Sequence, residues 1–210
     1  MAQYNTIADI RKSLNGGGAR PNLFEVDIPE NSLFKYVGSD SQLDSRVLVK
    51  AAQLPASNVA SIDVPFRGRI MKVAGDRTFD TWTVTVINDV DFNLRTAFQN
   101  WMQGIAQYAD ASGEADPQAY KSTATVTQLK RRSSNLGQTS DSGLEAAYTY
   151  DFFGIFPTNI SAIDLSYDTA DTIEEFTVEF QVDYWAPTFN KGGSSVTDNV
   201  DTTSQIQGSR

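Results

Sequence analysis

A basic segment between residues 67 and 77 stands out in a chain whose formal net charge is −9. It contains Arg67, Arg69, Lys72 and Arg77. Such a cluster could hold nucleic-acid phosphates, bind an acidic ligand, or contact carboxylates on another copy of the chain. The acidic balance argues against a broad grip on DNA or on an anionic membrane, because that binding needs a basic face.

Acidic residues recur at every fourth position near the end of the folded region. Glu175, Glu179 and Asp183 alternate with apolar residues in IEEFTVEFQVDYWAP, residues 173–187. This spacing places them on one face of a β-strand, where the simplest interpretation is a solvent-exposed face. Glu25 and Asp27 would strengthen the same negative field if their strand shared a sheet with this one.

Catalytic chemistry has few residues available to it. The chain contains no histidine and no cysteine, which removes the usual general base, the common nucleophile pairs and thiolate ligands. Three further motifs are also weak: NDVDFN at 88–93 lacks the later ligands of a calcium loop, GGG at 16–18 lacks the lysine of a phosphate loop, and KRR at 130–132 is typical of a solvated turn. We therefore expect no enzyme activity, no cofactor and no metal site. The sequence also contains no candidate membrane-spanning segment.

The elements that must position these charges are mostly strands. Alternating or β-branched segments predict strands at 22–28, 46–54, 58–66, 68–73, 78–88, 119–129, 146–156, 159–167 and 173–187. Pro65 and Gly68 mark a bend between the third and fourth of these. One helix is predicted over 91–108, with Asp89 or Asp91 as its cap and a single apolar stripe formed by Leu94, Phe98, Trp101, Ile105 and Tyr108.

These elements predict a mainly β fold of two packed antiparallel sheets, a sandwich or small barrel, with one flanking α-helix. We expect a flexible N-terminal arm at 1–20, a β-sandwich domain at 21–187 and a flexible C-terminal tail at 188–210, because both ends are poor in apolar residues.

Several motifs resemble the tail tube proteins of contractile-tailed bacteriophages. The most specific is VAGDRTFDTWTVTVIND at 73–89. Others are ARPNLFEVDI at 19–28, AQLPA at 52–56, AYKSTATV at 119–126, FPTNISAIDLSYD at 156–168 and EFTVEFQVDYW at 175–185. The Ser- and Asp-rich segment at 37–46 and the long C-terminal tail depart from the shorter family members.

The resemblance implies a structural virion protein, assembled in the host cytoplasm, that forms hexameric rings stacked into the inner tail tube, the conduit for DNA ejection. The implied partners are further copies of the chain, the tail sheath protein, the baseplate hub, the tail terminator, a tape measure protein in the lumen and genomic DNA in transit without tight binding. Under this reading, contacts between subunits or rings would come from Arg67, Arg69, Lys72, Asp76 and Arg77. An acidic lumen face would come from Glu25, Asp27, Glu175, Glu179 and Asp183.

Two alternatives remain open from the sequence. The chain could form the tube of a headless contractile machine, such as a tailocin or a type VI secretion system, where no DNA passes and an acidic interior has no clear use. A carbohydrate-binding β-sandwich module would instead need exposed coplanar aromatic rings. Trp82, Trp101 and Tyr184 all fall on apolar stripes, so we expect them to be buried.

Overall fold

A computed structural model describes residues 7, 9–10, 14, 18–35, 46, 48–110, 112–131, 144–168, 171–191 and 194–197. Most of the predicted arm at 1–20, nearly all of the segment 37–46 and the end of the predicted tail lie outside these residues. In the described part of the chain, no helix is long and apolar enough to cross a membrane.

The strands follow the predicted order, except that the strand predicted at 159–167 does not form. The observed strands are β1 (Phe24–Asp27), β2 (Val49–Ala52), β3 (Asn58–Phe66), β4 (Arg69–Thr78), β5 (Trp82–Ile87), β6 (Ser122–Arg131), β7 (Leu144–Ile160), β8 (Glu175–Gln181), β9 (Tyr184–Lys191) and β10 (Ser194–Thr197). β7 ends at Ile160, and residues 161–168 belong to the loop that leads to β8. Helix α3 (Asn93–Ile105) and the short helix α4 (Pro117–Tyr120) lie between β5 and β6. β9 continues past residue 187, where the folded domain was predicted to end, and β10 follows within the predicted tail.

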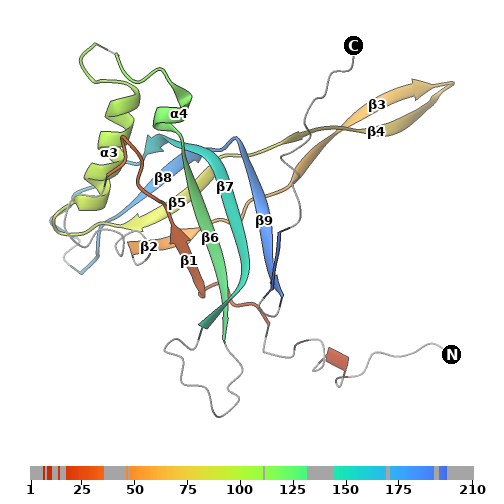
Figure 1. Cartoon of the computed structure of the whole chain (residues 1–210), viewed down its shortest axis with the longest axis horizontal. Helices are drawn as coiled ribbons and strands as arrows, with labels where there is room; N and C mark the ends of the chain where they lie inside the picture. The colour runs from red at the N-terminus through yellow and green to blue at the C-terminus, as the bar shows by residue number, and fades with distance from the viewer. Residues whose placement is uncertain are drawn as a thin grey trace.

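Two antiparallel sheets share the long strand β7 (Figure 1). The first sheet contains β1, β6, β7, β9 and β10 in that order. The second contains β7, β8, β5 and β2. The mainly β fold with two packed antiparallel sheets and a flanking helix is therefore confirmed.

The core lies between the two sheets. Trp82 of the second sheet stacks on Phe152 of the first, with ring centroids 4.5 Å apart. The apolar side of the alternation is buried in the strands of the two sheets, as Val84, Val126 and Phe180 show, but not in β3, where every residue is exposed. The indole nitrogen of Trp82 donates a hydrogen bond to the carbonyl of Gln53 at 3.0 Å, so its burial leaves no polar atom without a partner.

Helix α3 covers the core side of the second sheet. Phe98 packs against Phe176 and Phe180, with centroids 6.4 and 5.8 Å away, and Trp101 is fully buried beside them. The helix cap was predicted wrongly: the N-cap is Phe92, which has no oxygen in its side chain to accept a hydrogen bond, rather than Asp89 or Asp91. Asp89 lies one turn earlier, where its Oδ2 accepts the backbone N–H of Asn93 at 3.2 Å.

The predicted helical stripe was wrong at its C-terminal end. Tyr108 is 76% exposed because α3 ends at Ile105 and the backbone of Ala106 is extended. Loss of the helical period there removes Tyr108 from the buried face.

A corner interrupts the last predicted strand. Segment 173–187 divides into β8 and β9 at Val182 and Asp183. Strand β7 carries an extra residue beside this break, because Ser122 of β6 pairs with Ile155 and Thr123 pairs with Phe153. The bulge in β7 centres on Gly154, whose φ is 66°. Both strands therefore shift their inward side chains by one position as they pass from one sheet to the other.

The corner explains why Tyr184 is not buried, contrary to the prediction. Val182 and Trp185 point toward the core, so the residue that would have continued the alternation points outward. Tyr184 is 40% exposed and stacks on Phe153, with centroids 4.8 Å apart. Trp82 and Trp101 are buried as predicted.

Gly154→Ala should destabilise the protein by about 1–3 kcal/mol. A positive φ disfavours any other residue, and a Cβ at this position would overlap the carboxylate of Asp183. Urea unfolding followed by tryptophan fluorescence would measure the change in the free energy of unfolding. An unchanged midpoint would show that the corner does not depend on glycine.

Candidate functional site

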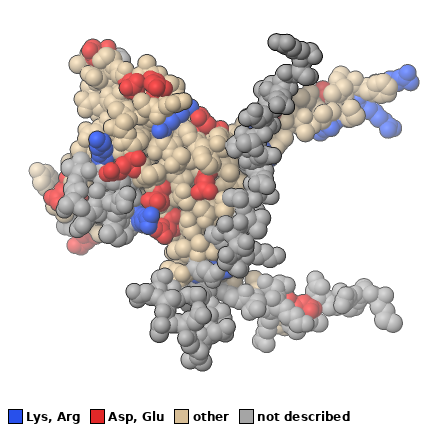
Figure 2. All heavy atoms as spheres, viewed as in Figure 1, with Lys and Arg blue, Asp and Glu red and all other residues tan. Residues whose placement is uncertain are grey.

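The basic segment lies on a hairpin that stands away from the body. Among the strands that the structure describes, β3 and β4 pair only with each other, and the hairpin extends beyond β9 on the side of the molecule opposite α3 (Figure 1). Every residue of β3 is exposed, as is every residue of β4 apart from the half-buried Gly75. Figure 2 shows basic side chains gathered toward the far end of the hairpin, whereas the body displays mainly acidic ones.

The turn of the hairpin explains its straight extension. Arg67 and Gly68 are its two loop residues, and both have positive φ, 46° and 80°. Positive φ at both central positions defines a type I′ turn, whose twist matches that of the flanking strands. The guanidinium carbon of Arg67 lies 5.2 Å from the ring centre of Phe66, so the first basic side chain folds back over the tip.

The two faces of the hairpin differ in chemistry. Residues paired across the strands share a face, and the register pairs Ile62 with Val73, Val64 with Met71 and Phe66 with Arg69. We call this the apolar face; its members are Ile62, Val64, Phe66, Met71, Val73 and, at the tip, Arg69. The opposite face contains Asp63, Pro65, Ile70 and Lys72.

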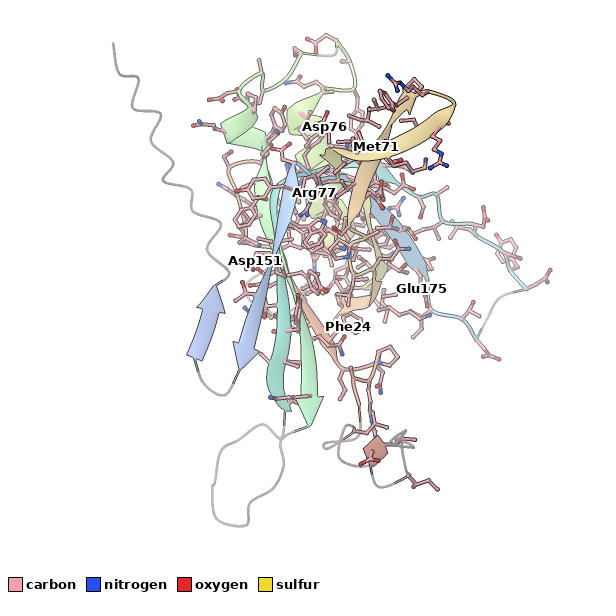
Figure 3. All side chains as sticks on the ribbon, turned by 90° about the vertical axis from the view of Figure 1, so that its right-hand side faces the viewer. Phe24, Met71, Asp76, Arg77, Asp151 and Glu175 are labelled. Atoms are coloured by element: carbon pink, nitrogen blue, oxygen red, sulfur yellow. The ribbon has the colours of Figure 1, made fainter. Side chains whose placement is uncertain are left out.

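The structure separates the five predicted contact residues of the hairpin. Arg69 lies on the apolar face, whereas Lys72 lies on the opposite face and forms an ion pair of 2.8 Å with Asp63. Arg77 pairs with Val59 near the base of the hairpin. Asp76, which lies next to Arg77 in Figure 3, belongs to an irregularity in the strand register. The sequence reasoning missed the apolar face, although its signal, the alternation of Ile62, Val64 and Phe66, was present.

Two of the predicted acidic residues form ion pairs with the same arginine. Glu25 and Asp27 lie on β1, and the guanidinium of Arg46 contacts both, at 3.3 Å to Glu25 Oε1 and 3.0 Å to Asp27 Oδ2. The pairs are half-exposed, so they contribute little to stability, but they neutralise part of the negative charge on this strand.

The other acidic residues belong to the second sheet and to the corner. Glu175 pairs with Lys50 at 2.5 Å, and Asp183 pairs with Lys121 at 2.7 Å. Within the part of the chain that the structure describes, Glu179 forms no ion pair.

The predicted acidic set is not one continuous row. β1 and β8 are separated by β6 and β7, and the outward faces of the two sheets point in opposite directions. Figure 3 shows this with Asp151 of the first sheet and Glu175 of the second on opposite sides of the core. Asp151 accepts hydrogen bonds from Thr125 at 3.0 Å and Thr188 at 3.1 Å, and the register Asp27–Thr125–Asp151 places it on the same outer face as Asp27, so the first sheet has an acidic face of its own, interspersed with threonines.

Among the described residues, no three histidine, cysteine, aspartate or glutamate side chains lie close enough together to hold a metal ion. Hydrogen bonds from the Ser112 hydroxyl and backbone N–H lower the pKa of Asp110, which lies in the exposed loop after α3 and in neither charged set. The described surface is therefore suited to protein–protein contacts, through an apolar hairpin with a basic tip and through separate acidic faces.

Comparison with known proteins agrees with this picture. The family model described as phage tail tube protein matches residues 19–188. Tail tube protein gp19 of Enterobacteria phage T4 is 33% identical over 180 residues, which cover 85% of this chain and 98% of the relative. The T6 protein of the same name matches equally well.

A solved structure shares the fold. The sheath-tube complex of an extracellular contractile injection system, PVC, in its extended state contains a chain that superposes with a TM-score of 0.56 at 14% identity, covering 89% of this chain and 100% of that one. Together with the sequence match over nearly the whole length of the T4 and T6 proteins, this establishes that the chain belongs to the phage tail tube protein family, whose members are structural proteins and not enzymes.

Proposed function

We propose that this protein polymerises as stacked hexameric rings into the inner tube of a contractile phage tail, through which the genome is ejected into the host. The observation that carries the proposal is the 33% identity to two phage tail tube proteins over 98% of their length. The sheath protein, the baseplate hub, the tail terminator, a tape measure protein and transiting DNA are the partners that this assignment brings with it, and assembly would take place in the host cytoplasm.

The architecture supports assembly on physical grounds. Within the described ranges, β1, β2 and β10 each have one neighbouring strand in their sheet. Strands with unpaired edges favour association unless another chain covers them. Closing several copies into a ring would pair such edges between neighbours. The extended hairpin also favours assembly, because an isolated two-stranded hairpin is at best marginally stable in water and gains stability when a partner covers it.

For the lumen, we propose the outward face of the second sheet, where Glu175 and Glu179 lie on β8 and Asp183 lies at its end. Glu179 faces Thr83 on β5, so this surface presents carboxylates among hydroxyls. An acidic wall would repel the phosphates of DNA and keep it moving through the bore. The alternative places this face outward against the sheath, and Glu25 and Asp27 on β1 would then be candidates for the lumen.

Electron microscopy of the purified protein tests the assembly directly. We expect stacked rings with a central hole and sixfold symmetry in class averages. A protein that stays monomeric at high concentration, and that also fails to extend tails added as nuclei, would contradict the proposal.

Glu179→Lys tests the lumen. Because Glu179 forms no ion pair with the described residues, the substitution adds a positive charge without breaking one, and we expect tubes that assemble normally but phage that eject DNA slowly. Fluorescence measurement of ejection from single particles would check this. Glu114→Lys, on the exposed loop after α3, makes the same change of charge as a control. Equal ejection rates for both variants and the parent would place the β8 face outside the lumen.

The double variant Arg69→Glu, Arg77→Glu tests the proposed contact of the basic hairpin with neighbouring carboxylates. Reversing both charges should weaken polymerisation most at low salt, where attraction between charges is least screened. Sedimentation of polymer at 0.05 and 0.5 M salt would measure it. Polymerisation as efficient as that of the parent protein at low salt would remove the hairpin charges from the contact.

A further inference from the structure

We propose that the apolar face of the β3–β4 hairpin docks into a groove formed by the loop between β7 and β8 of a neighbouring copy. The inference rests on the proposed function, because it names the two surfaces through which copies of the chain meet. It also shifts the main contribution to binding from the basic side chains to the apolar ones.

The hairpin contributes an apolar surface that the fold of its own chain leaves uncovered. Phe66 is 66% exposed, and Ile62 and Met71 on the same face are also more than half exposed. Contiguous apolar surfaces of this kind mark interaction sites in soluble proteins, because their hydration is unfavourable. A hairpin with such a face gains stability when a partner covers it.

The groove lies between the two limbs of the β7–β8 loop. It is open to solvent, has a volume of about 660 Å³ and is lined by residues 162–167 and 172–175. Leu165, Tyr167 and Ile173 are strongly exposed there, so the groove offers apolar side chains of its own. These could pack against Ile62, Phe66 and Met71 of the hairpin.

The charges of the two surfaces are complementary. The described lining of the groove includes Asp164 and Glu174 and contains no lysine or arginine, while Glu175 at its edge is already paired with Lys50. The tip of the hairpin carries Arg67 in the turn and Arg69 on the apolar face itself. Opposite charges at the border of an apolar contact fix its orientation and exclude wrong partners.

The two surfaces cannot meet within one chain. The loop begins beside α3, where the Arg95 guanidinium donates hydrogen bonds of 3.3 Å to the carbonyl of Ser161. The hairpin extends from the other side of the body (Figure 1). A hairpin and a groove on opposite sides of each copy make a head-to-tail contact, which repeats into a ring or a stack without leaving internal copies unpaired.

Cysteine cross-linking tests the docking, and the chain contains no native cysteine to interfere. The pair Phe66→Cys with Leu165→Cys joins the apolar face to the groove. The matched control is Ile70→Cys with Leu165→Cys, because Ile70 is 65% exposed, close to the value for Phe66, but lies on the opposite face. After polymerisation and mild oxidation, we expect a ladder of covalent multimers on a non-reducing gel for the first pair and little for the control.

A second measurement does not need cysteine. Phe66→Ser should raise the protein concentration required for polymerisation by about tenfold or more, since burying a phenylalanine side chain stabilises by roughly 1.5–3 kcal/mol and 1.4 kcal/mol is a factor of ten. Ile70→Ser should leave it nearly unchanged. Equal effects of the two substitutions would overturn the assignment to the apolar face.

The outcomes separate the docking from the tube itself. Polymers that form without the cross-link between positions 66 and 165 overturn the docking and leave tube assembly standing. A parent protein that forms no rings overturns the proposed function, and the docking with it. Binding of the unpolymerised protein to anionic vesicles, with loss of this binding in Phe66→Ser and no cross-link, would assign the face to a membrane and overturn the proposal.

Discussion

The corner at Gly154 and Asp183 is the constraint on which the rest of the structure depends. Only a glycine there permits both the positive φ of the β7 bulge and the close approach of the Asp183 carboxylate, which Lys121 holds at 2.7 Å. The corner lets β7 belong to two sheets, so that both can close over one aromatic core. It also sends the outer faces of the two sheets in opposite directions, which separates Asp151 from Glu175 (Figure 3).

The molecule divides its apolar surface between two uses. The body buries its large side chains between the sheets and under α3, with ring contacts such as that of Trp82 on Phe152. The hairpin does the reverse, because it exposes Phe66 and its neighbours far from the core. A chain that can fold without covering this surface retains it for contacts with other copies, which is the property that a subunit of a polymer needs.

Much of the fold was predictable from local patterns. The alternation of apolar residues located the strands and the buried faces of Val84 and Phe180, and the 3.6-residue period located α3. The errors had specific causes. Tyr108 was assigned to the helical stripe because the period does not show where a helix ends, and Tyr184 was assigned to the core because a bulge shifts the alternation without a clear sequence signal. The apolar face of the hairpin was overlooked because alternation alone does not reveal whether a second layer covers a strand.

The sequence by itself determined the fold class, the family resemblance and the absence of histidine and cysteine chemistry, since these follow from residue types and local spacing. Only the tertiary structure decided which charges act together. Glu25 and Glu175 look equivalent in the sequence but lie on strands separated by β6 and β7, and Arg69 and Lys72 point to opposite faces of one hairpin. The physical reason is that strand pairing and the corner join residues far apart in the chain, and their register is fixed by packing rather than by any local pattern.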